Sequence, residues 1–129
     1  MRQPTVVLVE DETEMADIMS INLEQAGYRV IQARDGVEGY AAVESAEPDA
    51  VILDLNLPSM SGFRLARLLR REDRWKGLPL IVATAFTFDE VEELANEGID
   101  GFITKPFDPM DLVNRLEFIL SRSARAHAN

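Results

Sequence analysis

The sequence predicts an α/β fold in which five short strands alternate with five helices and form one parallel sheet. Five apolar runs alternate with amphipathic stretches along the 129 residues. The apolar runs are continuous rather than alternating, which is typical of strands that are covered on both faces. A helix-length segment separates each pair of consecutive strands, and such crossovers connect parallel neighbours. We therefore expect helices on both faces of the sheet.

The composition predicts one acidic, soluble domain. The chain is 47% hydrophobic, and its 13 Lys and Arg residues against 23 Asp and Glu residues give a net charge of −10. This charge argues against direct binding to nucleic acid, which needs a basic surface. The chain has no cysteine, so disulfides and thiolate chemistry are excluded. No apolar run approaches the ~20 residues of a membrane span, and no secretion signal is visible. We expect a single cytoplasmic domain with a core at about 5–121, a short tail at 122–129 and no membrane contact.

The first half of the chain contains three predicted strands and two predicted helices. The run TVVLV at 5–9 is rich in β-branched residues and predicts a buried strand. Apolar residues at helical spacing predict a helix at 13–26, which a glycine ends. The more polar YRVIQA at 28–33 predicts a strand at an edge of the sheet. A short helix with two glycines at 36–46 and a third strand, AVILD at 50–54, follow.

The second half continues the same alternation. We expect a helix at 62–71, GFRLARLLRR, and a strand at 78–84, LPLIVAT. An acidic helix is predicted at 88–98 and a short strand, GFIT, at 101–104. The last helix is predicted at 109–120, where a proline suits the first turn.

Charged and polar residues follow four of the five predicted strands. Glu10 and Asp11 follow the first strand, and Asp54 closes the otherwise apolar third strand. Thr84 ends the fourth strand, and Lys105 follows the fifth. Sites in parallel sheets lie outside the carboxyl ends of the strands, so these groups should converge on one rim. A carboxylate carried into a buried position is costly unless it is paired or coordinated.

This combination of groups is suited to phosphoryl transfer. Three carboxylates close together repel one another and require a cation. Oxygen ligands of this kind suit Mg²⁺, which leaves coordination positions for water or a phosphoryl oxygen. An aspartate can act as a nucleophile and form an aspartyl phosphate, whose negative charge Lys105 would help to neutralise.

The segments VLVEDE, VILDLNLPSMSG, ATA and TKPF, in this order and spacing, resemble the receiver (response-regulator) domain of bacterial two-component signalling. The resemblance implies a flavodoxin-like, doubly wound sheet with strand order 2-1-3-4-5, as in chemotaxis regulators. It implies that Asp54 receives a phosphoryl group from a histidine of a sensor kinase or a phosphotransfer protein. The phosphorylated domain would then signal through the face formed by the fourth helix, fifth strand and fifth helix. Such a chain is a signalling switch that hydrolyses its acyl phosphate slowly, and not a turnover enzyme.

The resemblance also assigns a magnesium site. Asp54 matches the phospho-accepting aspartate, and Asp11 matches a direct ligand of Mg²⁺. Glu10 matches the acidic neighbour that acts through water, and Asn56 matches the residue that lends its backbone carbonyl.

The switch residues follow from the same resemblance. Thr84 and Lys105 match the hydroxyl and the ammonium group that bind phosphoryl oxygens. Phe102 matches the aromatic switch position, and Lys105–Pro106 matches a peptide bond that is usually cis in the family.

The last predicted helix suggests an output surface. Its apolar residues share one core-facing arc at 100° per residue, namely Leu112, Val113, Leu116, Ile119 and Leu120. Phe118 falls outside this arc, on the same side as Asp111 and Arg115, and could anchor a partner. The helix predicted at 88–98 has no Lys or Arg, so only Arg115 could serve a salt-bridged dimer through this face. We expect a monomer when unphosphorylated and no strong dimer of this type.

Several of these residues also have structural explanations. Asp11 could cap the first helix, with Glu14 completing a capping box. Thr84 and Phe102, each taken alone, are ordinary strand residues. His127 lies in the predicted tail and is assigned no role.

Other functions fit the pattern less well. A haloacid-dehalogenase-like phosphatase needs a nucleophilic aspartate after the first strand and a second aspartate two residues later. In this chain the corresponding aspartate, Asp54, follows the third strand, and the residue two positions later is Asn56. A flavodoxin-like flavin carrier needs a phosphate loop where EDETE would repel a phosphate, and no GxGxxG is present for a dinucleotide. The remaining alternative is a receiver-like protein-interaction module that binds its partners whatever its phosphorylation.

Overall fold

The structure, a computed structural model, describes residues 3–87, 89, 92 and 98–128, with side chains described as far as residue 122. Five parallel strands form one sheet in the order β2-β1-β3-β4-β5, which confirms the predicted doubly wound fold. The strands are β1 (Thr5–Val9), β2 (Arg29–Ala33), β3 (Ala50–Leu53), β4 (Leu80–Thr84) and β5 (Gly101–Thr104).

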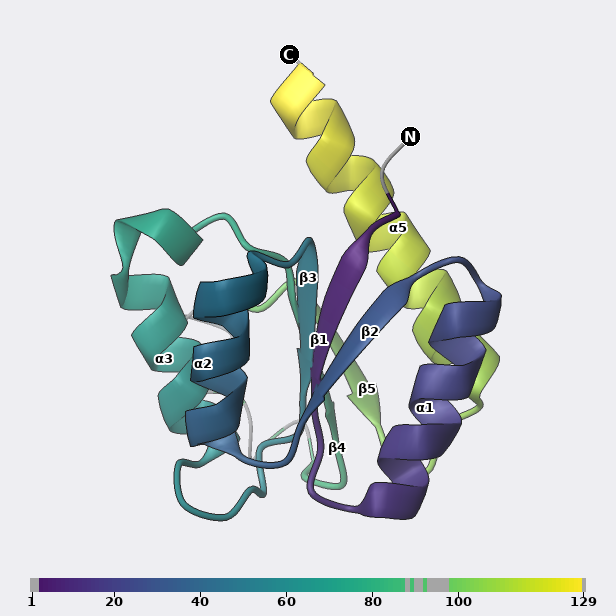
Figure 1. Ribbon diagram of the computed structural model, residues 1–129, viewed down its shortest axis with the longest axis vertical. Helices are drawn as coiled ribbons and strands as arrows, with labels where there is room; N and C mark the ends of the chain where they lie inside the picture. The colour runs from purple at the N-terminus through teal and green to yellow at the C-terminus, as the bar shows by residue number, and fades with distance from the viewer. Residues whose placement is uncertain (1–2, 88, 90–91, 93–97, 129) are drawn as a thin grey trace.

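Helices cover both faces of the sheet. Those of the described residues are α1 (Thr13–Gln25), α2 (Gly36–Ala46), α3 (Gly62–Arg71), the 3-10 turn η1 (Asp73–Trp75) and α5 (Pro109–Ala128). Figure 1 shows α1 and α5 on one face and α2 and α3 on the other. The helix predicted at 88–98 lies largely outside the described residues. Within the described part of the chain, no helix is long and apolar enough to cross a membrane.

The apolar strands supply two hydrophobic clusters, one on each side of the sheet. Because successive strand residues point to opposite faces, Val7 and Val9 of β1 pack toward α2 and α3, whereas Val6 and Leu8 pack toward α1 and α5. The interior strands β1, β3 and β4 are buried throughout. β2 lies at an edge and is mostly accessible, which confirms the prediction made from its polarity.

Two glycines allow the helices on one face to approach the loop after β3. A Cβ atom at Gly62 would collide with the backbone carbonyl oxygen of Asp54, and one at Gly36 would collide with that of Met60. The N-terminus of α3 is also capped, because Ser61 Oγ accepts the backbone N–H of Arg64 at 3.3 Å. The loop that follows Asp54 is therefore held closely between these helices.

The structure corrects five predicted boundaries. α1 ends at Gln25 rather than at residue 26, and β2 begins at Arg29 rather than at residue 28. β3 ends at Leu53, so Asp54 is the first residue beyond the strand rather than its last. β4 begins at Leu80, because the preceding Pro79 has no N–H to donate to a ladder. α5 continues to Ala128, through most of the segment predicted to be a tail. Residues 121–128 contain no glycine or proline and are rich in Ala and Arg, which favour helix.

Candidate functional site

The site is built on backbone pairing at the carboxyl ends of the central strands. The register places Val9 of β1 beside Leu53 of β3, so Glu10 and Asp54 leave the sheet next to each other. The ladder continues beyond the strands, because Asp54 N–H donates to Val9 O and Glu10 N–H donates to Ala33 O, each at 3.0 Å. Backbone hydrogen bonds thus position both acidic residues independently of the contacts that their side chains make.

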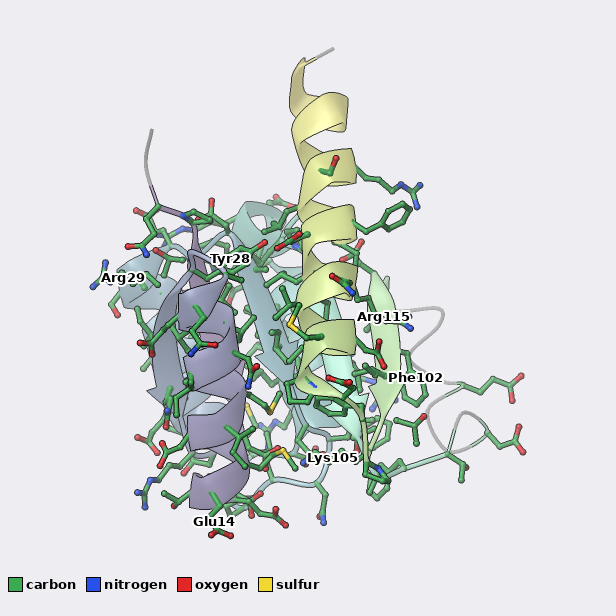
Figure 2. The ribbon with its side chains drawn as sticks, turned by 90° about the vertical axis from the view of Figure 1, so that its right-hand side faces the viewer. Glu14, Tyr28, Arg29, Phe102, Lys105 and Arg115 are labelled. Atoms are coloured by element: carbon green, nitrogen blue, oxygen red, sulfur yellow. The ribbon has the colours of Figure 1, made fainter. Side chains whose placement is uncertain are left out.

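Lys105 joins the two carboxylates. Its Nζ atom donates to Glu10 Oε1 at 2.5 Å and to Asp54 Oδ2 at 2.8 Å. The side chains of Lys105, Glu10 and Asp54 are only 13%, 2% and 9% exposed. The backbone N–H of Lys105 donates to Thr84 O at 2.8 Å, and the Lys105–Pro106 peptide bond is cis. Figure 2 shows Lys105 at the same end of the molecule as Glu14 in the first turn of α1.

Burial and ion pairing shift the pKa values of Glu10 and Lys105 in opposite directions. Burial raises the pKa of Glu10 above its usual value, and the hydrogen bond from Lys105 offsets this only in part. Burial also acts to lower the pKa of Lys105, but the hydrogen bonds to Asp54 and Glu10 outweigh it, and the pKa is raised. The ammonium group is therefore firmly charged, while the cluster retains more negative charge than one cation neutralises.

Three carboxylates at this rim are close enough to share one cation. Glu10, Asp11 and Asp54 each offer an oxygen within 4.8 Å of the others. Asp11 is exposed, so the cluster opens to water on one side. Anionic oxygen donors with an open side fit Mg²⁺, which keeps several of its waters. The prediction that Asp11 could cap the first helix is wrong. The N-cap residue of α1 is Glu12, and the Glu12 side chain accepts no capping hydrogen bond.

Asn56 lies in the loop after β3, with its side chain exposed. Its backbone N–H donates to Asp54 Oδ1 at 3.1 Å. Both oxygens of Asp54 therefore have a partner, one from Asn56 and one from Lys105. The role expected for the Asn56 carbonyl remains a prediction.

Thr84 is fully buried at the end of β4, and its Oγ1 accepts the backbone N–H of Phe86 at 3.3 Å. The ring of Phe86 stacks on Phe63 of α3, with centroids 6.0 Å apart and planes at 28°. Phe102 on the neighbouring β5 is half-buried and pairs with Val82. The sequence analysis missed Phe86, whose only signal is an aromatic residue two positions after Thr84.

The outer side of α5 carries the predicted aromatic residue. Phe118 is 62% exposed, and the guanidinium carbon of Arg122 lies 5.7 Å from its ring centroid. The apolar residues predicted to face inward are buried or partly buried, namely Leu112, Val113, Leu116, Ile119 and Leu120. Figure 2 shows Arg115 and Phe102 on the same side of α5, next to β5. A groove of about 630 Å³ there is lined by both elements and by Phe118.

Comparisons with known proteins identify the family of this chain. The family model of the response regulator receiver domain matches residues 6–117. The DNA-binding dual master transcriptional regulator RpaA of Synechocystis sp. is 37% identical over 95% of this chain and 51% of its own length. The chain therefore spans about half the length of this curated relative.

Two solved structures show the same fold. The chemotaxis response regulator CheY4 of Vibrio cholerae superposes with a TM-score of 0.86 at 30% identity, covering 92% of this chain and 99% of CheY4. The receiver domain of the sensor histidine kinase PA1611 from Pseudomonas aeruginosa has a TM-score of 0.85 at 26% identity, with 93% and 99% coverage. That domain was solved with a magnesium ion coordinated in its active-site cleft. The chain belongs to the response regulator receiver domain family and is a phospho-accepting receiver of two-component signalling.

Proposed function

We propose that Asp54 is the phospho-accepting residue and that the donor is a phosphohistidine on a sensor kinase or a histidine phosphotransfer protein. The observation that carries this proposal is the buried carboxylate of Asp54, which shares Lys105 with a second buried carboxylate, Glu10. A carboxylate oxygen of Asp54 attacks phosphorus and forms an O–P bond. The N–P bond of the phosphohistidine breaks, and the imidazole nitrogen keeps the electron pair.

The residues of the chain bind and orient the phosphoryl group. Mg²⁺ held by Glu10, Asp11, Asp54 and the carbonyl of Asn56 would supply neutralising charge. Lys105 already contacts Asp54 Oδ2, so only a short movement is needed for it to pair with a phosphoryl oxygen. The buried surroundings of Lys105 and Glu10 strengthen these charge interactions relative to water.

Thr84 would connect the phosphoryl group to the rest of the domain. Its hydroxyl oxygen accepts the N–H of Phe86, which leaves the hydroxyl proton to donate to a phosphoryl oxygen. Movement of Thr84 toward the site would open space into which Phe102 turns. Such a rearrangement selects one of two states of the surface beside β5.

The output surface is proposed to lie over β5 and α5. Phe118 would be an apolar anchor for a partner, with Arg115 lining the same groove. Phe118→Ala should leave phosphorylation of Asp54 intact and weaken partner binding by more than ~1 kcal/mol. Unchanged partner affinity in a titration would contradict this role.

We also infer a cytoplasmic domain that is monomeric before phosphorylation and makes no direct contact with nucleic acid or membrane. The helix predicted at 88–98, which the predicted absence of a strong dimer concerns, lies largely outside the described residues. The chain acts as a switch, and its catalysis is limited to its own phosphorylation and slow dephosphorylation.

The test is phosphorylation by a small donor. Acetyl phosphate with Mg²⁺ should label the wild-type chain, and Asp54→Asn should abolish the labelling. EDTA should prevent labelling of the wild type. Labelling of the Asn variant at the wild-type level would favour the alternative, an interaction module that does not depend on Asp54. Strong labelling in EDTA would contradict the role of the metal.

A further inference from the structure

The positive charge of this acidic chain is concentrated in one segment. Six of its 13 Lys and Arg residues lie within residues 64–76, namely Arg64, Arg67, Arg70, Arg71, Arg74 and Lys76. In contrast, residues 10–17 at the rim of the site contain five acidic residues and no basic one. A chain with a net charge of −10 thus presents a local basic region on α3 and η1.

Arg70, Arg74 and Lys76 pair with neighbouring parts of the domain. Arg70 donates to the carbonyl oxygens of Gly98 and Trp75. Arg74 pairs with Glu44 and Glu47, and Lys76 pairs with Asp73. These contacts account for the basic residues at the C-terminal end of the region and in η1.

The other three arginines form what we call the α3 outer face, defined as Arg64, Arg67 and Arg71. At 100° per residue they fall within an arc of about 60°. This arc is opposite the buried residues of the helix, which are Gly62, Leu65, Ala66 and Leu69. Arg64 and Arg71 are exposed, and neither forms an ion pair with another described residue. Like charges three and four residues apart repel along a helix, so the clustering of these arginines does not itself stabilise α3.

A groove runs along the α3 outer face. It has a volume of about 400 Å³ and is lined by Ser61, Phe63, Arg64, Arg67, Leu68 and Arg71. Phe63 and Leu68 are half-buried and give the groove apolar parts between the guanidinium groups. Figure 1 shows α3 at the outside of the molecule, on the face of the sheet opposite α5.

We propose that the α3 outer face binds an acidic segment of a partner protein. Arg64 and Arg71 are about 10 Å apart along the helix axis, which matches two or three carboxylates on neighbouring turns of a helical segment. Guanidinium groups bind carboxylates bidentately, and an apolar side chain between the carboxylates would contact Phe63 or Leu68. This surface is separate from the proposed output surface around Phe118.

The charge distribution favours an acidic protein over the other possible occupants. A nucleic acid would meet three arginines on an otherwise acidic domain, whereas phosphate binding requires an extended basic surface. A second copy could offer its acidic segments at residues 10–17 or 88–98, and a contact through the former would cover the rim of the site. Such a contact is also head-to-tail and would produce open chains rather than a closed dimer.

The groove is connected to the switch through a pair of rings. Phe63 stacks on Phe86, whose backbone N–H donates to Thr84 Oγ1. We expect the affinity of the α3 outer face to change when Asp54 is loaded with beryllofluoride. This expectation rests on the proposed function, whereas binding to the unphosphorylated domain does not.

The test uses a fluorescent peptide of about 14 residues, long enough for four helical turns, with glutamates at helical spacing and a central leucine. Fluorescence anisotropy should show binding to the unphosphorylated chain that weakens as salt is added. The variant Arg64→Gln/Arg71→Gln should bind at least about tenfold more weakly, a loss of ~1.4 kcal/mol. The matched control Arg29→Gln/Arg34→Gln removes the same charge from exposed positions at β2 and should bind like the wild type.

Four results would overturn the proposal. They are absence of peptide binding by the wild type, equal loss in the control variant, tighter binding of labelled duplex DNA than of the peptide, and self-association that the double variant abolishes in light scattering. Failure of phosphorylation at Asp54 would leave the basal binding unchanged and would bear only on the proposed function.

Discussion

Lys105 and Arg70 are both largely buried cations, but they lie at opposite ends of the sheet and have different partners. The Arg70 side chain is 10% exposed, close to the 13% of Lys105. Arg70 donates to Gly98 O at 2.9 and 3.1 Å, to Trp75 O at 2.9 Å and to Asp100 Oδ2 at 3.1 Å. Asp100 Oδ2 also accepts the backbone N–H of Leu80, at 2.9 Å. Arg70 thus ties the end of α3 to the starts of β4 and β5.

The partners show which of the two cations belongs to a functional site. Around Arg70, one carboxylate and two backbone carbonyls satisfy one guanidinium group, and little charge remains. Burial lowers the pKa of Arg70 and Asp100 opposes this, as expected of a structural ion pair. Around Lys105, two carboxylates share one ammonium group and the carboxylate of Asp11 lies close to both, so the region retains net negative charge. Uncompensated charge, rather than burial alone, marks the site.

The largest effect is expected from removing Lys105. Lys105→Ala leaves the buried carboxylates of Glu10 and Asp54 without a cation and should lower the free energy of unfolding by about 3–5 kcal/mol. Phosphorylation by acetyl phosphate should fall as well, because an oxygen of the transferring group loses its positive partner. Urea unfolding with and without Mg²⁺ gives the check, since the metal should restore part of the lost stability. A variant as stable as the wild type in EDTA would contradict this picture of the cluster.

Removing Arg70 should reduce stability but not phosphorylation. Arg70→Ala leaves Asp100 and the Gly98 and Trp75 carbonyls without their donor, at a cost of about 2–4 kcal/mol. The rate of phosphorylation of the folded protein should stay within about twofold of the wild type, a difference of ~0.4 kcal/mol. Urea unfolding and acetyl phosphate labelling measure the two effects separately. A strong loss of labelling in a folded variant would mean that the two ends of the sheet are coupled.

Neutralising Glu10 should separate metal binding from folding. Because burial raises its pKa in the folded domain, the stability contributed by Glu10 is present below its unfolded pKa and is lost as pH rises through the folded pKa. Glu10→Gln should therefore flatten the pH dependence of stability in EDTA, with no loss of stability at neutral pH. Its affinity for Mg²⁺ should fall about tenfold, or ~1.4 kcal/mol. Urea midpoints across pH and a Mg²⁺ titration test both parts, and unchanged Mg²⁺ affinity would remove Glu10 from the metal site.

The smallest effect is expected at Arg74, which is exposed and pairs with two exposed carboxylates, Glu44 at 3.2 Å and Glu47 at 2.8 Å. Its guanidinium carbon also lies 4.5 Å from the ring centroid of Trp75. Solvent and salt screen such pairs, so Arg74→Ala should change the urea midpoint far less than Arg70→Ala. A decrease in stability as large as that caused by Arg70→Ala would show that side-chain exposure does not decide how much each arginine stabilises the fold.

The strands and the site could be predicted because their pattern is local. A continuous apolar run predicts a buried strand, and the residue after each run is placed by the parallel sheet. The ends of the predicted strands alone were enough to predict that Glu10, Asp54 and Lys105 lie at the same rim of the sheet.

The Arg70 contacts could not be predicted from the sequence. In GFRLARLLRR, Arg70 cannot be distinguished from the exposed Arg71, and its main partners are carbonyl oxygens, which have no sequence signal. The stacking of Phe63 on Phe86 likewise depends on how the loop after β4 meets α3. The length of α5 was underestimated because the apolar pattern ends at Leu120, whereas nothing in the following residues stops a helix.

The most direct test of the account is the position of the phosphoryl group. The wild-type chain is treated with acetyl phosphate and Mg²⁺, the acyl phosphate is reduced with borohydride, and peptide mass spectrometry locates the modified residue. We predict modification at Asp54, and none there when EDTA replaces Mg²⁺. Modification at Asp11 or another carboxylate, with Asp54 intact, would contradict the claim that the Lys105 cluster is built around Asp54.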